Sequence, residues 1–259
     1  MKIFDIELIK EQARSEKIGL ADAEKDYVLS VALAEISKLN AAEHLVFKGG
    51  TCLKKIYFPN YRFSSDLDFS ALANVKTGVK EKIVETFQFK ELNGVKFLKI
   101  IDKTEKGKST LRLSLQYESK IGSIKGKPHV DSIWMDFNFD SGVSIKPVKH
   151  QVILPAKYTL SPLPLLAMDL REILAEKISA VHNRPKPRDL YDLWFLLKEN
   201  TPIEHKIVNN KLQNEFDLEK FKARLEILKP KWDKDMKPLL QQTPNFDQTA
   251  KETVKMLHP

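Results

Sequence analysis

The spacing of apolar residues predicts the first elements of the chain. Over residues 27–39 apolar positions recur every three or four residues without a break by proline or glycine, which is the pattern of a helix. A short apolar run at 44–47 has the length of a strand, and another strand is predicted to begin at Asp66. Between these strands the pattern predicts a short helix at 52–57 and a loop at 58–63.

The pattern changes from mixed to helical near residues 155–169. Before this point it predicts a helix over 79–87 and strands over 96–101, 109–117 and 132–139. Turns are predicted over 102–108 and 120–128. After it the pattern predicts helices over 170–182, 189–197 and much of 215–259, with breaks at Pro230, Pro238 and Pro244. We therefore expect an α+β fold with two domains, a mixed sheet with flanking helices in 1–160 and a helical lobe in 161–259.

Cysteine content and hydrophobic runs narrow the class of protein. The 259 residues include one cysteine, Cys52, which excludes an internal disulfide and favours a reducing, cytoplasmic setting. The longest apolar runs are shorter than the roughly 18 residues that a membrane-spanning helix needs. Residues 1–17 mix acids and bases and lack the apolar centre of a signal peptide. We expect no association with a membrane.

The net charge favours a polyanionic partner. Lysine and arginine total 43 and aspartate and glutamate 35, which gives a formal charge of +8. Such a surplus is suited to nucleic acid, a nucleotide or an acidic protein, although many basic proteins bind none of these.

Two short motifs together point to phosphate chemistry. Gly49 and Gly50 lie between a predicted strand and a predicted helix, where the absence of side chains lets the backbone approach a phosphate closely. Asp66 and Asp68 are two residues apart on a predicted strand, so both carboxylates lie on one face. Their mutual repulsion favours a cation between them, and Mg²⁺ prefers such oxygen ligands. A nucleotide held beside Mg²⁺ is the arrangement of nucleotidyl or phosphoryl transfer.

A third acidic residue is expected to complete the metal site. Asp136 is flanked by apolar residues on a predicted strand, where burial of an unpaired carboxylate is costly. Each signal also has a plainer interpretation. A glycine pair is most often a simple turn, an Asp-x-Asp pair is often a solvated strand end or helix cap, and Asp136 would also fit a half-exposed edge position. The order and spacing of the motifs favour the functional interpretation.

The motifs resemble those of a known family. The segment from Lys48 to Thr51, Lys-Gly-Gly-Thr, and the segment 62–69, Arg-Phe-Ser-Ser-Asp-Leu-Asp-Phe, are similar to nucleotidyltransferase-type toxins of the AbiEii/AbiGii (MenT-like) family, within the DNA polymerase β-like nucleotidyltransferase superfamily. Residues 184–192 fit the family's fourth motif, Arg-x-Lys-x-x-Asp-x-x-Asp, and Lys177 fits the lysine of its third. The second motif is commonly Lys-x-Asp-x-Gly, but here Trp134, Asp136 and Asn138 stand in its places.

The resemblance implies a role for each matched residue. Asp66, Asp68, Lys177 and Asp192 would be catalytic, with Asp66, Asp68 and Asp136 as the Mg²⁺ ligands. Nucleotide-binding residues would be Lys48, Gly49, Gly50, Thr51, Ser64, Arg184, Lys186 and Asp189. Ser64 would be a capping or phosphate-binding hydroxyl and also a candidate site for a silencing modification. Asp189 would orient Arg184 or Lys186. As plainer alternatives, Lys177 would be a solvated helix lysine and Asp189 a helix N-cap.

The resulting hypothesis is a Mg²⁺-dependent nucleotidyltransferase toxin of a toxin–antitoxin system. It would transfer nucleotide from an NTP to an acceptor such as the tRNA 3′ end or another RNA, and an antitoxin protein would neutralise it. One alternative is a catalytically idle nucleotide- or RNA-binding module with the same fold. Another is an enzyme of this fold that acts on a small molecule or a protein hydroxyl. The intact acids at 66, 68 and 192 favour an active enzyme, and the basic charge favours a nucleic acid acceptor.

Overall fold

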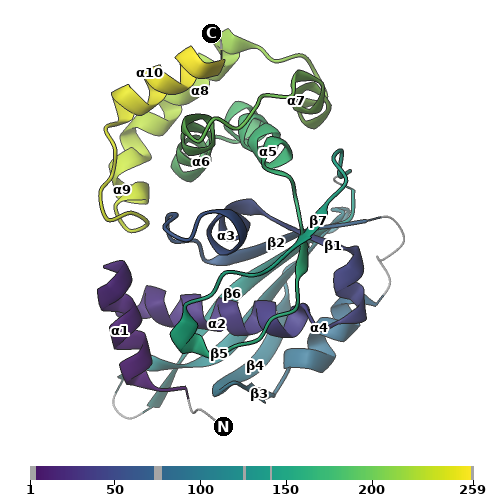
Figure 1. The fold of residues 1–259 in the computed structure, drawn as a ribbon, viewed down its shortest axis with the longest axis vertical. Coiled ribbons are helices and arrows are strands. Elements are labelled where there is room, and N and C mark those ends of the chain that lie inside the picture. Colours follow the sequence, from purple (N-terminus) through teal and green to yellow (C-terminus); the bar gives the residue numbers. More distant parts are fainter. Residues whose placement is uncertain (1–3, 73–77, 125–126, 141, 258–259) are drawn as a thin grey trace. The chain divides into compact units, whose positions relative to one another are not determined.

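The chain packs into two compact units in a computed structural model that describes residues 4–72, 78–124, 127–140 and 142–257 (Figure 1). Unit 1 comprises residues 1–143 and 147–167, and unit 2 comprises 144–146 and 168–259. The division into two independent domains, 1–160 and 161–259, stays a prediction. None of the described helices is long and apolar enough to span a lipid bilayer.

Unit 1 is built on a mixed sheet. Its helices are α1 (Ile6–Glu16), α2 (Leu20–Ile36), α3 (Gly49–Cys52) and α4 (Val79–Phe87), with a π-helical turn at Leu53–Tyr57 directly after α3 and single 3₁₀ turns at Asn40–His44 and Ala156–Tyr158. Its strands are β1 (Leu45–Lys48), β2 (Asp66–Ala71), β3 (Glu91–Leu92), β4 (Val95–Asp102), β5 (Thr110–Ile124), β6 (Lys127–Asn138), β7 (Val148–His150) and β8 (Leu165–Ala167).

The strand order places β1, β2 and β6 side by side. Within the described residues the eight strands have the order β3-β4-β5-β6-β2-β1-β8-β7. The pairs β2–β6 and β1–β8 are parallel, and the other neighbours are antiparallel. The mixed sheet confirms the expected α+β fold. Because β2 and β6 are far apart in sequence, only the sheet brings their side chains together.

The central strands have one apolar face and one polar face. Phe47, Phe69 and Phe137 are register partners across β1, β2 and β6, and all three are fully buried. Their rings contact one another with centroids 5.3 Å apart for each neighbouring pair. Since side chains alternate along a strand, the residues before and after them lie on the opposite, polar face. Helix α2 packs against β5 and β6 (Figure 1).

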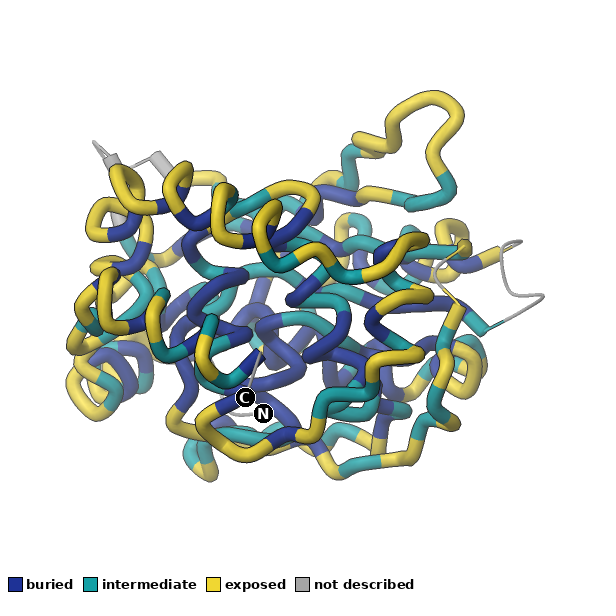
Figure 2. The backbone as a smooth tube through the Cα atoms, turned by 90° about the horizontal axis from the view of Figure 1, so that it is seen from above, coloured by how far each residue is buried: buried dark blue, intermediate teal, exposed yellow. Residues whose placement is uncertain are grey.

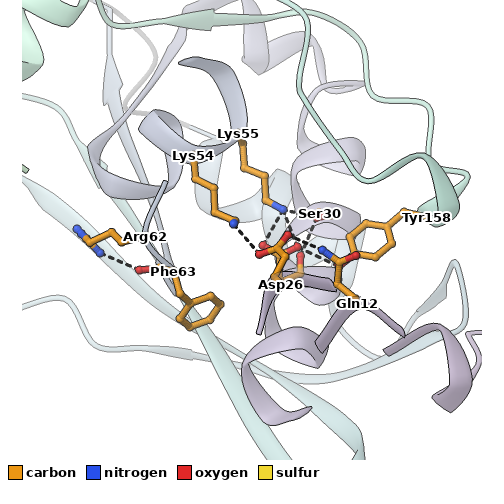
Figure 3. A network of polar contacts seen from close by, with 9 residues as sticks. Gln12, Asp26, Ser30, Lys54, Lys55, Arg62, Phe63 and Tyr158 are labelled. Carbon is orange, nitrogen blue, oxygen red and sulfur yellow. Dashed lines mark hydrogen bonds and ion pairs between the residues drawn. The ribbon is translucent and has the colours of Figure 1, made fainter. Parts of the chain in front are cut away.

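Helix α2 is buried on almost all sides, and apolar residues predominate from Tyr27 to Ile36. Figure 2 shows the buried positions in dark blue, with exposed positions concentrated in loops and on outer helix turns. The helix also carries a buried charge, Asp26. Its carboxylate pairs with Lys55 at 2.7 Å and accepts a hydrogen bond from the Tyr158 hydroxyl (Figure 3). Burial lowers the pKa of Lys55, and the charge of Asp26 opposes this shift.

Most of the predicted elements of unit 1 are confirmed, including the helix at 79–87 and the strands at 96–101, 109–117 and 132–139. The turn predicted over 120–128 is wrong for most of its length, because β5 continues to Ile124 and β6 begins at Lys127. Cross-strand pairing continues through this glycine-containing segment, with a register irregularity between Ser119 and Ile124 that accommodates it.

Unit 2 is helical. It contains α5 (Leu170–Asn183), α6 (Pro187–Lys198), α7 (His205–Leu212), α8 (Leu218–Leu228), α9 (Trp232–Met236) and α10 (Phe246–Leu257), with a 3₁₀ turn at Lys229–Lys231. The interruptions at Pro230, Pro238 and Pro244 are confirmed, since each proline lies outside the α-helices. Helix α5 begins where the Asp169 carboxylate accepts a hydrogen bond from the backbone N–H of Arg171.

Candidate active site

A row of charged residues crosses the polar face of the sheet. Lys48 on β1 is the register partner of Asp68 on β2, and Asp68 is the partner of Asp136 on β6. Asp136 is in turn opposite Arg112 on β5. Register partners lie on the same face of a sheet, so the row reads positive, negative, negative, positive. Lys48 and the two aspartates are half-buried, and Arg112 is exposed.

Asp66 lies on the same face, two residues before Asp68. It is half-buried and is the register partner of Trp134. Its backbone C=O accepts a hydrogen bond from the hydroxyl of the buried Thr51, and its Oδ1 accepts one from Ser65 Oγ at 3.3 Å. The three carboxylates that the sequence indicated for a metal site thus lie on one face of two neighbouring strands.

Gly49 and Gly50 follow β1 and form a glycine turn at the start of α3. This turn lies directly against Asp68. Gly49 has φ +75°, which L-residues adopt with strain, and a Cβ added there would collide with the Asp68 carboxylate. The same Cβ would lie 3.1 Å from Cγ of Asp68 and 3.2 Å from its Cβ. Gly49 is therefore required both by its backbone conformation and by the space that Asp68 occupies.

The second glycine faces two polar side chains. A Cβ added at Gly50 would lie 2.7 Å from Nη2 of Arg62 and 2.9 Å from Oγ of Ser64. Arg62 is buried, donates a hydrogen bond from Nη1 to the C=O of Phe63 at 2.9 Å (Figure 3), and contacts the Tyr61 ring. Arg62 was not among the predicted site residues. Its position between two aromatic residues, Tyr61 and Phe63, was the available signal that it is buried.

The acidic residues of the sheet suit Mg²⁺. This ion is usually held by one or two carboxylates, with water and substrate phosphates completing its shell. Asp66 and Asp68 supply such a pair, and the absence of a side chain at Gly49 leaves room for the Asp68 carboxylate. In the described part of the chain, no group of three His, Cys, Asp or Glu residues is close enough to hold a metal by itself. A metal here would thus need oxygens from the substrate.

A second set of predicted site residues meets in unit 2. Lys177 Nζ on α5 is 2.8 Å from Asp189 Oδ1 and 2.8 Å from Asp192 Oδ2, both on α6. The Asp192 side chain is fully buried, and the side chains of Lys177 and Asp189 are 12% and 7% exposed. Lys177 is therefore a nearly buried, doubly paired cation, and the interpretation as a solvated helix lysine is wrong.

The start of α6 decides the role of Asp189. The helix begins at Pro187 with Lys186 at the N-cap position, so Asp189 lies inside the first turn and is not the N-cap. There its charge interacts favourably with the helix dipole as well as with Lys177. The flanking Arg184 and Lys186 are exposed.

A comparable ion pair stabilises another part of unit 2. The fully buried Glu172 pairs with Lys211 Nζ at 2.7 Å, and Glu176 lies 3.4 Å from the same atom. Glu172 also accepts hydrogen bonds from the backbone N–H groups of Ser144 and Ile145. Sequence reasoning did not indicate this pair, because its members share no motif.

The chain belongs to a family of nucleotidyltransferases. Its residues 31–252 match the family described as "Nucleotidyl transferase AbiEii toxin, Type IV TA system", and the chain is a member of that family. It is thus a nucleotidyltransferase of a type IV toxin–antitoxin system, which implies a nucleotide substrate and an antitoxin partner.

Two solved structures share the fold. MenT4, a nucleotidyltransferase toxin from Mycobacterium tuberculosis H37Rv, is similar at 19% identity and a TM-score of 0.72, over 98% of this chain and 89% of that one. JHP933 from Helicobacter pylori is similar at 19% identity and a TM-score of 0.55, over 92% and 91%. None of the curated proteins compared matches this chain. The predicted family and fold are confirmed.

Proposed function

We propose that the protein is a Mg²⁺-dependent nucleotidyltransferase that transfers nucleotide from an NTP to an RNA acceptor, the tRNA 3′ end. The observation that carries this proposal is the convergence of Asp66, Asp68 and Asp136 on one face of β2 and β6 beside the Gly49 turn. Neither the pair of aspartates nor the glycine turn would by itself indicate nucleotide transfer.

The reaction forms one P–O bond and breaks another. The acceptor hydroxyl oxygen attacks the α-phosphorus of the NTP, the bond between the α-phosphorus and the α–β bridging oxygen breaks, and pyrophosphate leaves. The hydroxyl proton passes to a carboxylate or to water. Asp66 and Asp68 hold Mg²⁺, and Asp136 is the third carboxylate of the set. Bound Mg²⁺ supplies positive charge to the phosphates and lowers the pKa of the attacking hydroxyl.

The residues around the glycine turn bind the phosphates. Gly49 and Gly50 offer backbone without side chains, so phosphate oxygens approach their N–H groups closely. Lys48 adds positive charge beside Asp68, and Ser64 contributes a hydroxyl beside Gly50. Thr51 acts through its hydrogen bond to the backbone of Asp66 and so positions that strand.

The ion-paired group of unit 2 serves the same reaction in this proposal. Lys177 neutralises triphosphate charge, and its two pairs with Asp189 and Asp192 hold the ammonium group in place. The exposed Arg184 and Lys186 contact the nucleotide. We propose these roles from the match to the family's third and fourth motifs and from the burial of the group.

The acceptor is proposed from charge. A formal charge of +8 favours binding of an RNA backbone, and this contribution weakens as salt rises. An antitoxin protein is expected to suppress the transfer, and the cytoplasm is the compartment where NTP and tRNA are available.

The test is transfer of labelled nucleotide to RNA. Purified protein is incubated with each of the four labelled NTPs, Mg²⁺ and total tRNA, beside Asp66→Asn and Asp68→Asn. Asp102→Asn is the matched control, because Asp102 is a strand-end aspartate that pairs with Lys80. We expect labelling of tRNA by the native protein and Asp102→Asn only, and loss of labelling on chelation of Mg²⁺.

Each other outcome changes a different part of the proposal. Transfer to a small molecule or protein, but not to RNA, would replace the acceptor. Binding of NTP that needs Asp66 and Asp68 without any transfer would leave an idle nucleotide-binding module. Transfer by Asp66→Asn and Asp68→Asn at the native rate would refute the assignment of the site.

A further inference from the structure

Arg112 has a place in the charged row that no sequence motif indicated. It lies on β5, directly opposite Asp136, and its Nε is 3.2 Å from Asp136 Oδ1. Its guanidinium carbon is 5.1 Å from the centroid of the Trp134 ring, which belongs to the same face of β6. Its backbone N–H donates to Thr104 Oγ1 at 3.1 Å. The side chain is thus held by a carboxylate, an aromatic ring and an anchored strand.

These contacts use only part of the guanidinium group. An arginine has five N–H donors. Nε of Arg112 lies close enough to Asp136 Oδ1 for an ion pair, but Oδ1 accepts no hydrogen bond in the described part of the chain. Within the ranges that the structure describes, the Arg112 guanidinium group donates no hydrogen bond, and half of the side chain is exposed. The guanidinium group is therefore close to Asp136 and Trp134 and still has donors that a ligand can reach.

Arg171 shows the contrast with an arginine whose donors are occupied. Its Nε and Nη2 donate to the two oxygens of Asp169 at 2.9 and 3.0 Å, and its Nη1 donates to Glu204 at 3.3 Å. Its side chain is 38% exposed, comparable with Arg112. All three of its nitrogens have a protein partner, so Arg171 has a structural role.

We propose that Arg112 is a phosphate-binding residue of the active site, held by Asp136 and Trp134 so that its Nη edge receives two oxygens of a reactant phosphate. This inference rests on the proposed function, because it assumes that the carboxylates beside Arg112 hold the reaction centre. A guanidinium fork matches a phosphate in two parallel hydrogen bonds, and the aromatic ring beneath it limits its orientation.

The phosphate belongs either to the NTP or to the RNA acceptor, and kinetics separate the two. In Arg112→Gln, a rise in KM for NTP alone assigns the triphosphate, and a rise in KM for tRNA alone assigns the acceptor backbone. Loss of a bidentate charged contact is expected to raise the affected KM about tenfold to a hundredfold. Arg112→Lys keeps the charge without the fork and is expected to recover part of the loss.

A binding measurement tests the inference without turnover. Calorimetric titration with inorganic tripolyphosphate and Mg²⁺ uses a probe with phosphates but no base. If the NTP supplies the phosphate, Arg112→Gln is expected to weaken this binding about tenfold or more, and Arg171→Gln to leave it unchanged. If the acceptor supplies it, the same variant weakens binding of tRNA in a gel-shift titration instead. Circular dichroism and Tm identify a variant that has lost its fold.

The two proposals fail in different ways. If the native protein transfers nucleotide and Arg112→Gln matches it in both KM values and in both titrations, the role of Arg112 is refuted while the proposed function stands. If the native protein neither transfers nucleotide nor binds tripolyphosphate or tRNA, both are refuted. Equal loss of binding in Arg112→Gln and Arg171→Gln would also refute a specific role for Arg112, because it would report only net charge.

Discussion

Gly49 lies against the carboxylate of Asp68 so closely that its missing side chain is part of the site. Gly49 directly follows β1 and begins α3, and Asp68 lies in β2. Strands β1 and β2 pair in antiparallel register through Lys48 and Asp68. The conformation of the turn and the position of a proposed metal ligand are therefore coupled. Any side chain at 49 must displace one or the other.

Gly49→Ala is predicted to abolish transfer. The substitution places a methyl group 3.1 Å from Cγ of Asp68 and forces alanine to adopt φ +75°. The backbone strain alone costs about 1–2 kcal/mol, and the displaced carboxylate removes activity. Gly107→Ala is the control, because Gly107 has the same φ of +75° and open space around it. Tm and transfer rate are measured for both. Equal activity in the two variants would contradict the coupling of Gly49 and Asp68.

Lys177→Met is predicted to lose both stability and transfer, whereas Lys211→Met loses stability alone. Each lysine is 12% exposed, pairs with a fully buried carboxylate at 2.7–2.8 Å and contacts a second acid. Removing either cation leaves a buried charge, which costs about 3–5 kcal/mol in comparable pairs. Denaturant titration gives the stabilities, and transfer is assayed where both variants are folded. If their activities fall equally, Lys177 has only a structural role.

The buried pair of Lys55 and Asp26 is predicted to be strongly coupled. Lys55 donates hydrogen bonds to Asp26 at 2.8 Å and to Ser30 at 3.0 Å in surroundings that exclude solvent (Figure 3). Lys55→Met alone leaves the Asp26 carboxylate buried without its cation and is expected to cost about 3–5 kcal/mol. The double variant Lys55→Met, Asp26→Asn removes both charges and is expected to be more stable than Lys55→Met. Urea unfolding of the four proteins tests this, and additive effects would contradict it.

Stability is predicted to fall above pH 10, in part through Tyr158. Burial, and next the charge of Asp26, raise the pKa of Tyr158 above its ordinary value. Above about pH 10 the unfolded chain releases this proton and the folded chain retains it, so stability falls as pH rises, by up to about 1.4 kcal/mol per pH unit.

Tyr158→Phe tests this dependence. The variant loses the hydrogen bond to Asp26 at every pH, which lowers its stability by a constant amount, about 1 kcal/mol. Its stability is expected to fall less steeply than that of the native protein between pH 10 and 11. Urea titrations at pH 8, 10 and 11 measure both effects. Parallel curves for the two proteins would show that Tyr158 does not contribute to the slope.

Local patterns were sufficient for most of the elements and for the motifs. The helix at 79–87 and the strand that begins at Asp66 follow from periodicity alone, because burial of one face imposes a repeat on the sequence. The glycine pair and the Asp-x-Asp pair are short, contiguous motifs, so the chemistry that we propose for them was predicted without a fold. The turn expected over 120–128 was wrong because strand pairing, which is not local, continued through a glycine.

By itself the sequence determined the family and the α+β class, and it indicated the residues that we propose carry phosphate chemistry, since these depend on residue types at fixed spacing. The tertiary structure decided which distant residues become neighbours. Asp136 and Arg112 join Asp68 in one row only because β6 pairs with β2 in parallel and with β5 in antiparallel register. The partners of Lys177 and the burial of Arg62 were likewise decided by packing. Such contacts depend on strand register and on which faces are buried, and neither is encoded in a short segment of chain.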